Sequence, residues 1–200
     1  YLGVPNFSKA VADFGIEVAK KHNVPLNRAL DIGSGPGRTA IELTSAFKHV
    51  CAIDFSVSFI ELCKKHIPEY PIPQGHELKA IVGDAHDLIS EEKYDLVVAI
   101  NLIDRLETPK KFLDGIKPLI SDRGILIIAS PYTWMDKFTE HDKWLGGFMK
   151  WGETQTTENG LKEALSPEFE LLEPPTDIPF VIPDPDNSYQ YTLSNATVFG

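Results

Sequence analysis

Apolar residues recur along the chain in two alternating spacings. Near the N-terminus they stand three or four positions apart, as at Val11, Phe14 and Val18, which is the spacing of one buried helix face. Further along, short and nearly continuous apolar runs alternate with segments of helical spacing. Such runs are typical of strands covered on both faces, as in a parallel sheet. The pattern therefore predicts strands that alternate with helices.

The predicted elements give a sheet of seven strands. Helices are expected to begin near Arg38, Ser56 and Pro109, and the helix after Ser56 is expected to turn Phe59 and Leu62 inward. The proline-rich segment 174–186 is interpreted as a long connection between two late strands, which would form an antiparallel hairpin. We predict an α/β fold with a Rossmann-like, doubly wound, mostly parallel sheet and an antiparallel edge hairpin. The predicted strands cover residues 28–32, 50–53, 78–82, 94–100, 124–129, 169–172 and 189–199.

One stretch interrupts this alternation. Residues 132–152 contain all three tryptophans and the Gly146-Gly147 pair, and we interpret them as an inserted lid over a substrate site. Trp151 is expected to pack in the interior of this insertion. The length of 200 residues suits one domain, so residues 1–200 are predicted to form a single domain with the lid inserted.

Charge and composition narrow the classes of partner. The net charge is −10, and lysine and arginine are scattered, so a nucleic-acid backbone is not expected as a ligand. The six histidines and two cysteines have no metal-ligand spacing, and no metal is predicted. No apolar run is long enough to span a bilayer, so no membrane association is expected. Two thiols interpreted as buried and reduced suit a cytoplasmic protein.

The strongest chemical signal is the glycine turn at residues 31–37, which follows the first strand. Its spacing is GxGxG, whereas the dinucleotide fingerprint GxGxxG would place a glycine at position 38, where this chain has arginine. Pro36 removes one backbone donor from the turn, which weakens the case for a pyrophosphate cradle. The turn thus indicates a nucleotide-like ligand without two phosphates.

Acidic residues stand at or just beyond the ends of three successive strands. Asp54 could accept the hydroxyls of a ribose, Asp84 lies where an adenine amino group would be met, and Asp31 could bind an ammonium group. Each aspartate alone is more often a turn former or a helix cap. Their ordered occurrence favours S-adenosylmethionine, which carries a sulfonium and an ammonium group, over a dinucleotide.

These residues resemble the class I S-adenosylmethionine-dependent methyltransferases over roughly residues 29–131. The resemblance implies that Asp31 and the glycines lie near the methionine moiety, Asp54 on the ribose, Phe55 against the adenine and Asn101 facing the methyl group. The predicted cofactor-binding residues are Asp31, Gly33, Ser34, Gly35, Gly37, Arg38, Asp54, Phe55, Ser56, Asp84, Ala85 and Asn101.

A narrower resemblance comes from segments 101–106, 130–134, 143–147 and 194–199. Together they are similar to the carboxy-terminal methyltransferase domain of ovothiol synthase. This resemblance implies methylation of an imidazole nitrogen of 5-thiohistidine and an upstream sulfoxide synthase domain. The glycine turn is richer in glycine than that family's turn.

An acceptor pocket is expected over the ends of the fourth and fifth strands, beside Asn101. Asp104 and Arg105 would hold the charged ends of an amino acid, because arginine suits bidentate binding of a carboxylate. The two could equally form a local ion pair. In this hypothesis the rings of Tyr132 and Trp134 pack on the imidazole, and Trp144 closes the lid.

Three other functions remain open on these residues. The chain could methylate another small amine or carboxylic acid. It could be a nicotinamide-dependent oxidoreductase, against which Pro36 and Arg38 count. It could also be a non-catalytic module that binds S-adenosylmethionine and assists a neighbouring domain.

Overall fold

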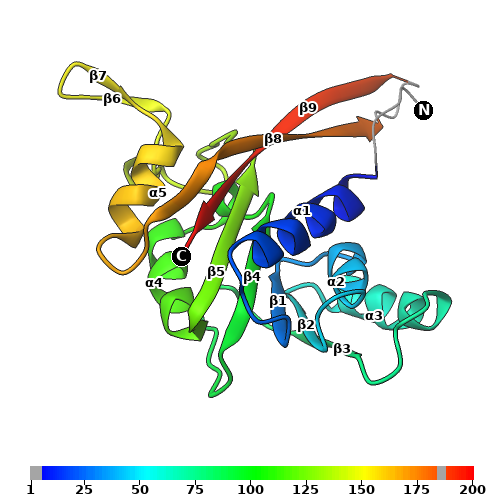
Figure 1. Ribbon diagram of the computed structural model, residues 1–200. Coiled ribbons are helices and arrows are strands. Elements are labelled where there is room, and N and C mark those ends of the chain that lie inside the picture. The colour runs from blue at the N-terminus through cyan, green and yellow to red at the C-terminus, as the bar shows by residue number, and fades with distance from the viewer. Residues whose placement is uncertain (1–5, 184–187) are drawn as a thin grey trace.

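The computed structural model describes residues 6–183 and 188–200, and its centre is a seven-stranded sheet. The strands of this sheet are β1 (Arg28–Ile32), β2 (His49–Asp54), β3 (Glu77–Val82), β4 (Tyr94–Ile100), β5 (Ile120–Ser130), β8 (Leu171–Pro183) and β9 (Tyr189–Phe199). Their order across the sheet is β3-β2-β1-β4-β5-β9-β8 (Figure 1). Strands β1 to β5 are parallel, whereas β9 runs antiparallel to both β5 and β8. The predicted mostly parallel α/β sheet with an antiparallel edge hairpin is confirmed.

Helices cover both faces of the sheet. They are α1 (Phe7–Lys21), α2 (Arg38–Leu43), α3 (Val57–His66), α4 (Pro109–Ile116) and α5 (Thr157–Leu165). The first three contribute buried residues to one face of the sheet, and α4 and α5 contribute them to the other. Each helix in the described part of the chain is too short or too polar to cross a membrane.

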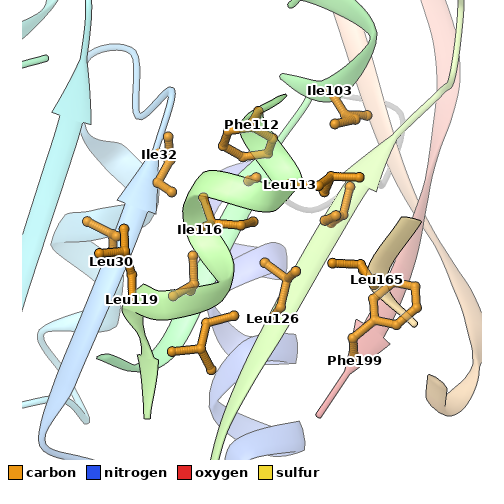
Figure 2. Packing of buried hydrophobic residues seen from close by; sticks show 14 of the residues in the cluster. Leu30, Ile32, Ile103, Phe112, Leu113, Ile116, Leu119, Leu126, Leu165 and Phe199 are labelled. Carbon is orange, nitrogen blue, oxygen red and sulfur yellow. The ribbon is translucent and has the colours of Figure 1, made fainter. Parts of the chain in front are cut away.

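The buried side of α4 packs against the centre of the sheet. Figure 2 shows Phe112 and Ile116 of this helix beside Leu30, Ile32 and Leu126 of the strands. Alternate residues of β1 point to opposite faces, so Ala29 joins the cluster that covers the other face. Both faces of the strand must therefore be apolar, which explains the continuous apolar runs in the sequence.

The prediction for α3 was wrong at two positions. Phe59 and Leu62 are exposed, and only Ile60 and Cys63 of this helix are buried. Residues three apart share a helix face, and the centre of the Phe59–Leu62 pair lies about 100° around the axis from the centre of the buried Ile60–Cys63 pair. The helix has a narrow buried face, so the apolar count of the segment overstated how much of it faces the core.

The interpretation of the proline-rich segment as a long connection was wrong, because residues 174–183 belong to strand β8. Strand β8 continues to Pro183, and Pro179 pairs in register with Leu193 of β9. Proline has no N–H to donate, but β8 is the outermost strand and bonds to a neighbour on one side only. The pairing shifts between Glu173 and Thr176, which accommodates the two adjacent prolines between them. The end of the predicted connection, 184–186, lies outside the described residues.

Residues 132–152 lead into a separate two-stranded sheet formed by β6 (Phe148–Lys150) and β7 (Glu153–Gln155). Trp151 lies in the turn between these strands and is 95% exposed, so the expectation that it packs internally was wrong. Gly146 lies against the backbone of Thr157, where a Cβ atom would collide with it. The segment is therefore held against the start of α5.

Candidate functional site

The glycine turn after β1 lines a cavity on one side and packs against helix α3 on the other. Gly35 and Gly37 both adopt positive φ angles, of 53° and 82°, which residues with a Cβ rarely adopt. A Cβ on Gly37 would collide with the sulfur of Cys63, so only glycine lets α2 begin this close to α3. A Cβ on Gly35 would meet no atom within 4 Å, because Gly35 faces the cavity.

Asp54, the last residue of β2, ties two loops together. Its Oδ2 accepts a hydrogen bond from the amide of Gly35 at 2.8 Å, and its Oδ1 accepts one from the amide of Ser56 at 2.9 Å. A carboxylate offers about four acceptor positions, so both oxygens can still accept from a ligand. Asp54 also lines the cavity, where it could take the two hydroxyls of a ribose.

Asp31 carries a buried carboxylate that lacks a full set of partners. It is 2% exposed, and among the described residues none donates to its Oδ2. Burial raises the pKa of Asp31 to about 7, the amide of Ala40 acts against this rise, and the charge of Asp54 adds to it. A buried acceptor without a donor is costly, and a cationic group would satisfy it. The site thus fits the ammonium group of a methionine tail.

The cavity beside this turn has a volume of about 510 Å³, which is within the usual range for sites of small ligands. It lies at the carboxyl ends of the parallel strands, the position expected of ligands in open α/β sheets. Of the predicted site residues, those that line it are Gly33, Gly35, Asp54, Phe55, Asp84, Ala85, Asn101 and Arg105.

Five predicted cofactor residues do not line this cavity: Asp31, Ser34, Gly37, Arg38 and Ser56. The guanidinium of Arg38 instead forms an ion pair with Glu42 and a hydrogen bond with the hydroxyl of Tyr70. Ser56 caps α3 by accepting from the amide of Phe59. Arg38 and Ser56 therefore hold the helices around the cavity, and Asp31 lies behind the glycine turn.

The adenine end predicted for the cavity contains an aromatic and an acidic group. Phe55 is 79% exposed and lines the cavity, where its ring is free to stack on a flat ligand. The Oδ1 of Asp84 accepts from the amide of His86 at 2.8 Å, and this bond lowers the pKa of Asp84. The ring of His86 also contacts Asp84 through Nδ1, and its Nε2 accepts from the amide of Thr108. A neutral imidazole with its proton on Nδ1 satisfies both bonds.

Sequence reasoning missed several residues of this wall. Phe59 was assigned to the core, yet it lines the cavity, as Phe55 does. A sequence signal existed, since an apolar residue in the first turn of the helix after a ligand-binding strand end can face the ligand. The others carried no recognisable spacing; they are Ile32, Ile53, Gly83, His86, Leu102, Leu106 and Glu107.

Asn101 stands between this cavity and a second one. It has a φ of 52°, which asparagine tolerates better than most residues, and its Oδ1 accepts from the hydroxyl of Ser194 at 2.6 Å. The second cavity has a volume of about 280 Å³, and Asn101 and Arg105 line both. Its other lining residues are Asp104, Pro131, Thr133, Phe180, Ile182, Gln190 and Thr192. The four residues from β8 and β9 were missed, because the hairpin was expected only at the sheet edge.

Asp104 and Arg105 form the ion pair that was one of the two alternatives for them. Asp104 is 1% exposed and accepts from the hydroxyls of Ser130, at 2.6 Å, and Thr133, at 3.2 Å. Its Oδ2 lies 3.0 Å from Nη1 of Arg105. Because Asp104 is this buried, its predicted direct contact with the molecule to be methylated is not supported. Asp104 instead orients Arg105, whose side chain is about a third exposed.

The three aromatic residues expected around an acceptor lie elsewhere. The indole N–H of Trp134 donates to the hydroxyl of Thr157 at 2.9 Å, and that of Trp144 donates to the carbonyl of Thr139 at 2.8 Å. Both rings pack against the cluster beneath α4 and α5, and neither lines the two cavities. Tyr132 is also packed there, and burial raises its pKa to about 12. The predicted packing of these rings on an imidazole is therefore not seen.

A third cavity, of about 400 Å³, lies at the amino ends of the strands. Its polar lining includes His49, which pairs with Glu77 at 2.8 Å, and Arg28, which pairs with Glu92 at 2.7 Å. These groups satisfy one another, and the cavity is at the end of the sheet opposite to the glycine turn. It is not a candidate for the cofactor site.

Comparison with known proteins agrees with this fold. Residues 30–126 match the family described as Methyltransferase domain. This match covers just under half of the chain, and the seven-stranded sheet has the fold of the class I S-adenosylmethionine-dependent methyltransferases. The cofactor of this class is the one that the acidic strand ends predicted.

Particular relatives differ widely in what they are named for. A polyamine aminopropyltransferase of Korarchaeum cryptofilum is 34% identical over 126 residues, which cover 56% of this chain and 38% of that protein. A mitochondrial ubiquinone biosynthesis O-methyltransferase of Schizosaccharomyces pombe is 28% identical, with coverages of 59% and 43%. The chain thus spans roughly two fifths of the length of these two relatives.

Among solved structures, an S-adenosylmethionine-dependent methyltransferase of Clostridium acetobutylicum has a TM-score of 0.67 at 15% identity. The superposition covers 98% of this chain and 92% of that one. At this identity the likeness establishes a shared fold, including the late strands that the family match does not reach.

Proposed function

We propose that this chain transfers the methyl group of S-adenosylmethionine to a small-molecule acceptor. The observation that carries the proposal is the 510 Å³ cavity at the strand ends, which has Asp54 in its wall and the unpartnered carboxylate oxygen of Asp31 behind it. The family match over residues 30–126 supports the same cofactor.

The chemistry asks the protein mainly for orientation. When bound, S-adenosylmethionine supplies an electrophilic methyl group on a positively charged sulfur. A lone pair of the acceptor forms the new bond to the methyl carbon while the carbon–sulfur bond breaks, which leaves a neutral thioether. Correct alignment of two reactants can supply effective molarities of about 10⁵–10⁸ M. Asn101 and Leu102 form the wall beside the glycine turn, so they would align the acceptor and exclude water.

The more specific proposal is an imidazole nitrogen of 5-thiohistidine as the acceptor. It rests on the resemblance of segments 101–106, 130–134, 143–147 and 194–199 to the methyltransferase domain of ovothiol synthase. A neutral imidazole already has a lone pair, so no strong general base is needed, and solvent can take the proton that the other ring nitrogen loses after the transfer. In this proposal the chain works in the cytoplasm, with an upstream sulfoxide synthase domain supplying the thiolated histidine.

A second candidate is methylation of another small amine or carboxylic acid. The named activity of the Schizosaccharomyces pombe relative, an O-methyltransferase, favours keeping this candidate, since the shared domain serves different acceptors. A non-catalytic cofactor-binding module is the remaining alternative.

Methyl-labelled S-adenosylmethionine tests these candidates. The purified chain is incubated with labelled cofactor and 5-thiohistidine, histidine or a panel of small amines and acids, and products are identified by mass. We expect label on thiohistidine and little on histidine. Label on another compound would favour the second candidate, and cofactor binding without turnover of any acceptor would favour the non-catalytic module.

A further inference from the structure

In Figure 1 the β8–β9 hairpin extends beyond the carboxyl end of β5 and over the start of α1. Residues of this hairpin line the second cavity. Building on the function proposed above, we propose that this cavity is the acceptor site and that it selects a small molecule that presents a carboxylate to Arg105. Asn101 and Arg105 line both cavities, so an acceptor bound here would lie next to the cofactor.

One face of the hairpin forms the outer wall of this site. Phe180 pairs across the strands with Thr192, and Ile182 pairs with Gln190, and all four side chains line the cavity. Side chains alternate between the two faces of a strand, so Tyr191 and Leu193 belong to the opposite, exposed face. The ring of Phe7 packs on Phe180 with 4.8 Å between centroids. The wall is therefore anchored to α1.

Arg105 is held so that one edge of its guanidinium remains for a ligand. Its Nη1 contacts the carbonyls of Asp104 and Thr133 at 2.9 and 2.8 Å, and its Nη2 contacts the hydroxyl of Thr133 at 2.8 Å. The plane also lies over the ring of Phe138, 5.1 Å from its centroid. A guanidinium has five N–H groups, and no described residue accepts from Nε. The edge formed by Nε and Nη2 suits a bidentate carboxylate.

The charges around the cavity favour an anion over a cation. Asp104 and Arg105 are the only charged residues in the described lining. Both oxygens of Asp104 already accept hydrogen bonds from Ser130, Thr133 and Arg105, and its side chain is 1% exposed. Because the carboxylate of Asp104 is this buried, an ammonium group entering the cavity could not reach it, whereas the side chain of Arg105 is about a third exposed and can meet a carboxylate. The volume of about 280 Å³ limits the acceptor to a small molecule.

Calorimetric titration of the protein saturated with S-adenosylhomocysteine tests the carboxylate preference. Two pairs of probes differ in this group: L-histidine with histamine, and phenylacetate with phenylacetamide. We expect the carboxylate member of each pair to bind about tenfold more tightly or better, since charge-assisted bidentate bonds are the stronger ones. Arg105→Gln should remove the difference, and Arg105→Lys, which keeps the charge without the fork, should retain part of it.

The hairpin wall is tested by size. Phe180→Ala should improve the binding of indole-3-acetate relative to phenylacetate several-fold. Tyr191→Ala is the matched control, because this aromatic residue is on the same hairpin but on the exposed face, and its ratio should equal that of the wild type.

A titration with S-adenosylhomocysteine alone separates the two proposals. Failure of the wild type to bind it would overturn the proposed function. Normal binding of it, together with equal affinity within each probe pair or no binding of either member, would overturn the carboxylate site and leave the methyltransferase proposal standing. Equal ratios for Phe180→Ala and Tyr191→Ala would overturn the role of the hairpin.

Discussion

Asp31 lies in an environment very different from that of a free side chain. Its carboxylate is buried, one of its oxygens has no partner among the described residues, and its pKa is raised from 3.8 to about 7. Between these two values, the folded chain holds a proton that the unfolded chain has lost. The stability of the ligand-free protein should therefore decline as the pH rises from about 4 to about 7. Above pH 7 the decline should stop.

The same proton links pH to cofactor binding. An ammonium group favours the ionised form of Asp31, so binding of S-adenosylhomocysteine below pH 7 should release a proton. We expect the affinity to be roughly tenfold lower at pH 6 than its plateau above pH 8, and calorimetry at several pH values would measure this. Asp31→Asn cannot ionise, and its weaker affinity should vary little over this range. A wild-type affinity that is constant from pH 5 to 8 would contradict the assignment.

Gly37 and Gly35 provide a matched pair at the glycine turn. Alanine at either position must adopt a left-handed backbone, which costs about 1–2 kcal/mol. At Gly37 the added Cβ also collides with the sulfur of Cys63, which adds about 1–3 kcal/mol of overpacking. Denaturant unfolding should therefore show a larger loss for Gly37→Ala than for Gly35→Ala. Equal losses would show that the α2–α3 contact is not limiting.

At the scale of elements, the β6–β7 hairpin carries a residue that its turn does not favour. Trp151 and Gly152 form the two-residue turn and both have positive φ angles, 57° and 86°. This geometry favours Asn-Gly. Trp151→Asn should slow amide hydrogen exchange about two- to fivefold at Lys150 and Glu153, the hydrogen-bonded pair that flanks the turn, whereas Trp151→Ala, which also removes the ring, should not. Faster exchange in the asparagine variant would refute the interpretation.

The elements were predictable where local rules and the burial pattern agreed. The apolar runs of β1 and β4 reflect cover on both faces of the sheet, and this gave their positions and the fold. The prediction ended strand β8 too early, because prolines are normally absent from strand interiors. Nothing in the segment itself reveals that it forms the outer edge of the sheet. An edge position is a property of the whole sheet and not of the segment.

For the whole molecule, the candidate site also has one part that could be predicted from the sequence and one part that could not. The grouping of acidic residues beside the glycine turn could be predicted, because Asp31 and Asp54 stand at the ends of adjacent strands and the ends of parallel strands meet at one edge. The lining of the second cavity, the proposed acceptor site, could not be predicted. Phe180 and Thr192 reach the second cavity only because β5 pairs with β9 and β9 with β8, which are contacts between distant parts of the chain. The tryptophans were misplaced for the opposite reason, since a cluster of aromatics marks a core as readily as a lid.

The central claim is that the cavity beside the glycine turn binds S-adenosylmethionine and not a dinucleotide. Calorimetric titration of the chain with S-adenosylhomocysteine and, separately, with NAD tests it most directly. Asp54→Asn serves as the site control, because the amide that replaces one carboxylate oxygen cannot accept from both loop N–H groups. We predict binding of one S-adenosylhomocysteine per chain, at least tenfold weaker binding in the variant, and no binding of NAD. Binding of NAD without S-adenosylhomocysteine, or of neither, would contradict the account.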